Sequence, residues 1–146
     1  FGIFHPALNL AQLYFEPADG VNYARHWFDE PLDGVPAKSV LMSEGMNDSY
    51  APPETIEALA ASGLLPQVMP VIEVVPGIDL AGLTELTPPV SGNAALGLVT
   101  VGLVQYPVDP GYDGHFVAFH DAGAIETWGG FLGAVAAGTM PVIDTR

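Results

Sequence analysis

The sequence predicts an α/β fold with a small parallel sheet and helices packed beside it. Two short apolar segments, residues 39–44 and 97–106, have the composition of buried strands, and both run into stretches rich in turn residues. Segments with the apolar spacing of helices follow them, at 53–63 and 121–138. This strand–helix–strand–helix order with long connections is typical of α/β proteins.

The composition fits about one domain with a real core. The chain has 146 residues, of which 49% are hydrophobic and only 14% are charged, so disorder is not expected. There are 17 Asp and Glu residues against 3 Lys and Arg, a formal net charge of −14. Binding to nucleic acid or to an anionic membrane surface needs clustered basic side chains, so both classes of partner are excluded.

Two further classes of structure are excluded by what the sequence lacks. No apolar run reaches the ~20 residues that a transmembrane span requires. The chain contains no cysteine, so it has neither disulfides nor thiolate metal sites.

The segment 1–36 is interpreted as a helical cap or lid. Residues 7–15 have apolar side chains at near-helical spacing, with Pro6 at the start and a turn at 17–20. Two interpretations remain open and are compatible: a helix packed on a core, or part of a lid lining an apolar substrate pocket. The segment is unusually aromatic, with Phe1, Phe4, Tyr14, Phe15, Tyr23, Trp27 and Phe28.

The segment 37–146 is interpreted as the α/β core. Residues 39–44 are expected to form a strand buried on both faces, which ends in the turn residues that begin at Gly45. Pro53 suits the first turn of the next helix, and Gly63 suits its end. The face of this helix that carries apolar side chains is formed by Ile56, Leu59 and Ala60.

The second half of this core begins with a long irregular stretch. Residues 64–93 contain many prolines and glycines and only one possible strand, 71–75. The strand 97–106 follows, and the loop 107–114 leads to His115. In the last helix Asp121 is a plausible N-cap. The side chains expected to face the core are Ile125, Trp128, Leu132 and Val135.

Two residues stand where an open α/β sheet places its functional groups, at the ends of its strands. Asp48 lies in the turn after the first strand, and His115 follows a glycine in the turn after the later one. Each residue also has a non-functional interpretation: Asp48 could be an ordinary turn aspartate, and His115 a structural histidine. His120 competes with His115, but it stands at a helix start, and the spacing between the two histidines fits no zinc motif.

The residues around these two positions resemble a known family. Gly45-Met46-Asn47-Asp48-Ser49-Tyr50-Ala51-Pro52-Pro53-Glu54-Thr55 is similar to the acid turn of bacterial α/β hydrolases of the lipase and esterase type. Gly114-His115-Phe116 resembles the turn that carries their catalytic histidine, and Phe131-Leu132 the end of their last helix. The resemblance covers most of the chain from residue 38 onward and, more weakly, the cap-like residues 9–24.

The resemblance implies the C-terminal portion of an α/β-hydrolase sheet that acts on small apolar carboxylic esters. Asp48 would orient His115, and His115 would accept the proton of a serine nucleophile. No cofactor or metal is required. A secreted or cell-envelope location is slightly favoured by the resemblance.

The sequence departs from the family in lacking the nucleophile. A serine on a G-x-S-x-G turn is absent. We therefore expect the serine to come from an upstream half of the same polypeptide or from a partner chain, and the chain alone to be inactive. The alternative is an acidic binding or structural module that keeps the acid and histidine as relics. The serines present are Ser39, Ser43, Ser49, Ser62 and Ser91.

Overall fold

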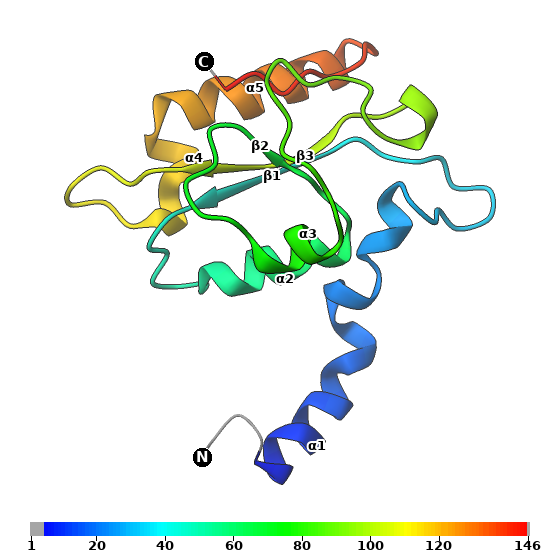
Figure 1. Cartoon of the computed structure of the whole chain (residues 1–146), viewed down its shortest axis with the longest axis vertical. Coiled ribbons are helices and arrows are strands. Elements are labelled where there is room, and N and C mark those ends of the chain that lie inside the picture. The colour runs from blue at the N-terminus through cyan, green and yellow to red at the C-terminus, as the bar shows by residue number, and fades with distance from the viewer. Residues whose placement is uncertain (1–4, 146) are drawn as a thin grey trace.

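The computed structural model describes residues 5–145, and it confirms a mixed α/β fold built on a small parallel sheet (Figure 1). The strands are β1 (Val40–Gly45), β2 (Gln67–Val68) and β3 (Val101–Tyr106). Their order is β1-β3-β2, and both neighbouring pairs are parallel. β3 is therefore the central strand, and all six of its residues are buried.

Helices cover both faces of this sheet. The α-helices are α1 (Pro6–Phe15), α2 (Pro53–Ser62), α3 (Pro76–Leu80), α4 (Val117–His120) and α5 (Ala122–Ala136). The 3-10 helices are η1 (Glu16–Ala18), η2 (Gly20–Asn22), η3 (Ala24–Trp27), η4 (Ala95–Gly97) and η5 (Gly114–Phe116). Figure 1 shows α2 and α3 on one side of the strands and α5 on the other.

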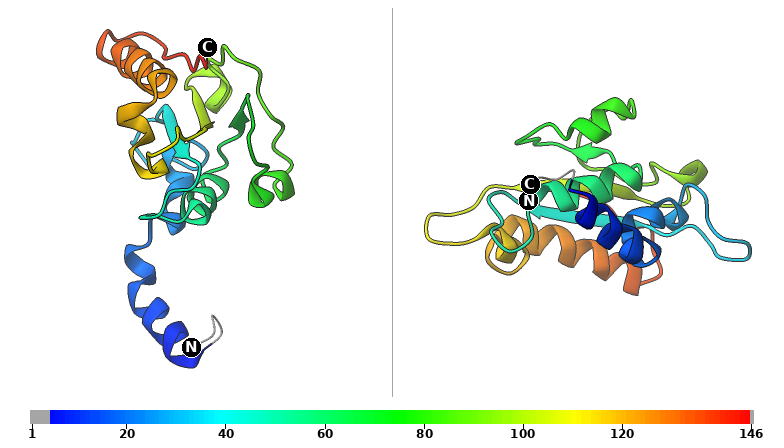
Figure 2. Two further views of the ribbon diagram at one scale, coloured as in Figure 1. Left: turned by 90° about the vertical axis from the view of Figure 1, so that its left-hand side faces the viewer. Right: turned by 90° about the horizontal axis from the view of Figure 1, so that it is seen from below.

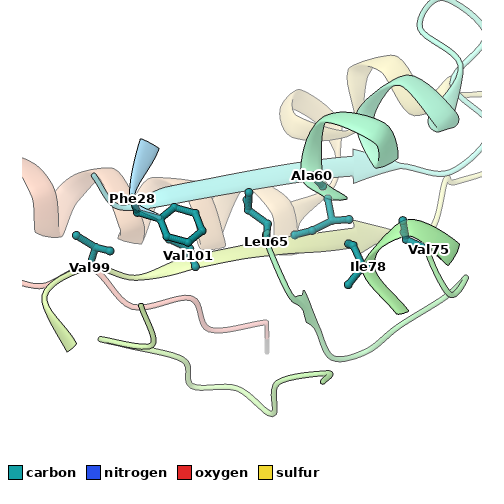
Figure 3. Packing of buried hydrophobic residues seen from close by; sticks show 8 residues of the cluster. Phe28, Ala60, Leu65, Val75, Ile78, Val99 and Val101 are labelled. Atoms are coloured by element: carbon teal, nitrogen blue, oxygen red, sulfur yellow. The ribbon is translucent and has the colours of Figure 1, made fainter. Parts of the chain in front are cut away.

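Each face of the sheet has its own apolar core. On the side of α2 and α3, Leu103 of β3 packs with Leu65 and with the residues labelled in Figure 3. On the side of α5, Val104 of β3 packs with Phe131 and Ile143. Alternation along β3 thus sends neighbouring side chains to opposite cores, as in a sheet covered on both faces.

The N-terminal segment forms the expected helix but does not pack on the core. α1 contains no buried residue, and it extends away from the sheet (Figure 2). The chain is anchored further on, where Ala24 and Phe28 are buried. The expectation that this helix packs on a core is not met within the described residues, because none of its side chains is buried. Residues 1–4 of the cap-like segment lie outside the described residues.

β1 is an edge strand, which corrects the expectation that it is buried on both faces. Its residues Val40–Ser43 are only half-buried, and only Glu44 and Gly45 are fully buried. The reason is its place in the sheet, because it has β3 on one side and no strand on the other among the described residues.

The irregular stretch 64–93 contains two elements that the sequence did not reveal, β2 and α3. The possible strand at 71–75 is wrong, since these residues form a loop. In this loop the backbone N–H groups bond to glutamine side chains instead of to a neighbouring strand. The side chain of Gln105 accepts from Ile72 and Glu73. The side chain of Gln67 accepts from Val75. These bonds satisfy the backbone of the loop without any partner strand.

The last helix, α5, begins as expected, because the carboxylate of Asp121 accepts from the N–H of Ala124. Its buried face is different from the expected one and consists of Ala124, Thr127 and Phe131. Ile125, Leu132 and Val135 are exposed instead. The small side chain of Ala124 is fully buried, so the pattern of large apolar residues pointed to the wrong side.

Candidate functional site

Asp48 lies in the turn between β1 and α2, and its carboxylate is fixed by that turn. Oδ1 accepts from the backbone N–H groups of Tyr50 and Ala51, each at 2.8 Å. Asn47 before it has a positive φ of 58°, a conformation that asparagine tolerates better than most residues. The side chain of Asp48 is only 5% exposed, so one oxygen is held by the backbone and the other is left for a partner.

His115 lies in η5, directly before α4, in the connection that follows β3. The carboxylate of Asp113 caps this turn by accepting from the N–H of His115 at 2.9 Å. Val117 is buried just beyond and anchors the turn, whereas Phe116 is 38% and Phe119 is 72% exposed. The imidazole ring itself is 41% exposed.

The side chains of Asp48 and His115 are within hydrogen-bonding distance of each other. Oδ2 of Asp48 lies 3.1 Å from Nδ1 of His115, although 67 residues separate them in the sequence. The parallel register pairs Gly45 at the end of β1 with Tyr106 at the end of β3, so both turns leave the sheet at its C-terminal edge. Open α/β sheets bind ligands at this edge.

Two glycines let the turns approach so closely. A Cβ on Gly45 would collide with the carbonyl of Gly114, and a Cβ on Gly114 would collide with the carbonyl of Met46. That second Cβ would also lie only 2.8 Å from the backbone nitrogen of Asp48. The backbones therefore touch, and any larger residue would push the acid and the histidine apart.

The electrostatics favour an ionised Asp48. Burial by itself would raise the pKa of this carboxyl, but the N–H groups of Ala51 and Tyr50 and the ring of His115 outweigh it, so the pKa is lowered. An ionised carboxylate can only accept hydrogen bonds, so the contact places the proton on Nδ1 of His115. In the neutral ring Nε2 is then an acceptor, and it has no hydrogen-bond partner among the described residues.

This arrangement can do specific chemistry. A histidine whose Nδ1–H donates to a buried carboxylate has its tautomer and ring orientation fixed, and its Nε2 can take a proton from a nearby hydroxyl. Tyr50 packs on the ring, with 4.9 Å between the ring centroids. The site therefore holds an oriented imidazole of the kind that can act as a general base, one half of what nucleophilic catalysis requires.

None of the five serines, all of which lie in the described part of the chain, makes a hydrogen bond with His115. Ser49 is the nearest in sequence to the acid, but its hydroxyl donates to Asp113. Ser39 accepts from the N–H of Thr100, while Ser62 and Ser91 donate to backbone carbonyls. The position from which a hydroxyl would reach Nε2 is thus not filled by a serine of residues 5–145.

Sequence reasoning missed two residues of the site. Asp113 holds the histidine turn, and Tyr50 covers the ring, yet in the sequence both look like ordinary turn and loop residues. The dipeptide Asp113-Gly114 is a typical turn signal and is the one feature that could have drawn attention to Asp113. Sequence reasoning also missed a buried acid outside the site, Glu44, which lies one residue before Gly45.

Glu44 is a fully buried acid at the end of β1. Its Oε2 accepts from the side-chain amide of Gln105 at 2.9 Å, and its Oε1 has no hydrogen-bond partner in residues 5–145. Burial raises the pKa of this carboxyl, as do the nearby carboxylates of Glu57 and Glu73, against the lowering effect of Gln105. Glu44 therefore holds a proton more readily than Asp48, four residues further along.

Compared with known proteins, the chain matches no family model, no curated protein sequence and no solved structure. In residues 5–145 no helix has both the length and the apolar character needed to span a membrane.

Proposed function

We propose that this chain supplies the acid and the base of a serine carboxylic ester hydrolase. Asp48 holds Nδ1 of His115, and Nε2 accepts the proton of a serine hydroxyl as it attacks the ester carbonyl. The same nitrogen then protonates the leaving alcohol. The observation that carries the proposal is the 3.1 Å contact between the two side chains at the C-terminal edge of a parallel sheet.

The nucleophile and the oxyanion hole are proposed to lie outside these 146 residues, in an upstream part of the same polypeptide. The open edge of β1 supports this part of the proposal. The N–H groups of Val40 and Met46 bond toward β3, so the alternate residues Leu41, Ser43 and Gly45 turn their backbone groups to the open side. β1 has no proline and no exposed acidic or basic side chain that would block the pairing of another strand.

The two edges of the sheet differ in whether their outer backbone groups are already hydrogen-bonded. Beyond β2 the backbone is occupied, because the N–H of Met69 bonds to the carbonyl of Leu86 and the N–H of Leu86 to that of Gln67. Beside β1 there is instead an apolar groove of about 600 Å³. It is lined by Ser39, Val40, Leu41, Ser43, Ala118, Phe119, Trp128, Phe131 and Leu132. A further strand of the hydrolase sheet, with its covering side chains, would fill both the edge and the groove.

The alternative, a non-catalytic binding module, has less support. An apolar pocket beneath the aromatic N-terminal segment, with no polar groups around His115, would favour it. Instead, α1 buries none of its residues, and the carboxylates of Asp48 and Asp113 both bond to His115. A histidine kept only as a relic has no need of a buried, ionised carboxylate on Nδ1.

The test is labelling by a fluorophosphonate, which reacts covalently with activated serines. We expect the protein made from the complete reading frame to be labelled, and the labelling to be lost in His115→Ala and strongly reduced in Asp48→Asn. His120→Ala is the matched control, because this histidine contacts the rings of Tyr112 and Phe116 and bonds to no acid among the described residues. No labelling of the complete protein, or labelling that is unaffected by His115→Ala, would overturn the proposal.

A further inference from the structure

The site contains a second carboxylate whose contacts are not explained by the roles of Asp48 and His115. Asp113 is half-buried and accepts three hydrogen bonds from two turns that are far apart in the sequence. Its Oδ1 accepts from the N–H of His115 at 2.9 Å and from the N–H of Ser49 at 3.2 Å. Its Oδ2 accepts from the hydroxyl of Ser49.

The two residues that Asp113 joins are adjacent to, or part of, the proposed catalytic pair. Ser49 directly follows Asp48, and His115 is the base itself. One carboxylate thus ties the backbone of the acid's turn to the backbone of the histidine's turn, independently of the Asp48–His115 contact. Hydrogen bonds to an ionised acceptor are the stronger kind, which suits a contact that must hold two loops in register.

We infer that Asp113 and Ser49 form a clamp that positions His115 against Asp48. This inference rests on the proposed function, and it names both residues as positioning residues rather than catalytic ones. Ser49 is given a role that excludes it as the nucleophile, because its hydroxyl is engaged by Asp113 rather than by His115. The clamp acts together with the Gly45–Gly114 backbone contact, which sets how close the turns can come.

The clamp makes a prediction that differs from that of a merely structural turn. If Asp113 sets the position of the ring, weakening it loosens the Nδ1–H bond to Asp48 while the rest of the fold stays intact. If Asp113 only stabilises its own loop, its loss lowers stability and leaves the ring proton unchanged. The readout is therefore the exchange of the Nδ1 proton of His115 with water, followed by ¹H–¹⁵N NMR on the full chain.

Two variants weaken the clamp mildly enough to keep the fold. Ser49→Ala removes one donor, and Asp113→Asn removes the charge but keeps an acceptor. For each we expect the Nδ1 proton to exchange roughly tenfold faster than in the wild type, the factor that a lost hydrogen bond to a charged group brings. Ser49→Thr retains the hydroxyl and should restore slow exchange.

Asp109→Asn is the matched control. It removes an equal charge from the same connecting loop, and its side chain makes no hydrogen bond to the turn that carries His115. It should leave the exchange rate as in the wild type. In the complete hydrolase, Ser49→Ala and Asp113→Asn should lower kcat with little change in KM, because the substrate-binding surface is not altered.

The outcomes separate this inference from the proposed function. A slowly exchanging Nδ1 proton in the wild type that is unaffected by Ser49→Ala and Asp113→Asn would overturn the clamp and leave the proposed function standing. A wild type with no proton on Nδ1 would overturn the proposed function, and the clamp with it. Faster exchange in both variants, reversed by Ser49→Thr, is the expected result.

Discussion

Nδ1 of His115 lies 3.1 Å from Oδ2 of Asp48, and the opposite oxygen of the same carboxylate is held by the N–H groups of Tyr50 and Ala51. The carboxylate is thus held in place by its own turn, independently of its contact with the histidine. This division of one carboxylate between backbone and imidazole keeps Asp48 ionised, and it makes the pair sensitive to pH and to the spacing of the two turns.

The first prediction concerns the stability of the fold at acidic pH. Because the folded-state pKa of Asp48 lies below its ordinary value of 3.8, the ionised form stabilises the fold. This contribution is fully present above the ordinary value and is lost as the pH falls through the folded-state pKa. Asp48→Asn keeps an acceptor for Tyr50 and Ala51 but does not titrate. Urea unfolding should therefore give a shallower loss of stability in acid for Asp48→Asn than for the wild type, and equal slopes would contradict the account.

Glu44 should behave in the opposite way. Its folded-state pKa lies above the ordinary value of 4.5, so its contribution is fully present below that value and is lost as the pH rises through the folded-state pKa. Glu44→Gln cannot ionise, so it should raise the free energy of unfolding at neutral pH, where burial disfavours the charged form of the wild-type carboxyl. Glu126→Gln, on the exposed side of α5, is the control and should change little. A destabilised Glu44→Gln at neutral pH would show that the ionised acid is needed.

The same substitution at two glycines should have opposite effects. Gly114→Ala places a methyl group against the backbone of Met46 and Asp48 and should cost about 1–3 kcal/mol of stability. Gly129→Ala, inside α5, meets nothing within 4 Å and should stabilise the helix by about 1 kcal/mol. Thermal unfolding measures both. A neutral Gly114→Ala would mean that the two turns are not in contact.

The sequence predicted those features that depend on local signals. Asp48 and His115 were found because each follows an apolar strand and lies among turn residues, and both strands ended close to where they were expected. α2 was predicted for the same reason, from a proline at its start and a glycine at its end.

What the sequence could not predict depends on contacts across the fold. β2 has only two residues, too few to display any alternation. Gln67 and Gln105 replace strand pairing with side-chain bonds to a loop, and a glutamine carries no local signal of that role. The face of α5 was misjudged because Ala124 is buried on account of its small size. Asp113 acquires its role only when residue 49 is brought beside it.

The most direct measurement is the tautomer of His115, read from the ¹⁵N shifts of its two ring nitrogens in the neutral state. We predict a proton on Nδ1 and none on Nε2 in the wild type, with this preference lost in Asp48→Asn. A neutral ring protonated on Nε2, or a mixture unaffected by Asp48→Asn, would contradict the claim that Asp48 orients His115 as a general base.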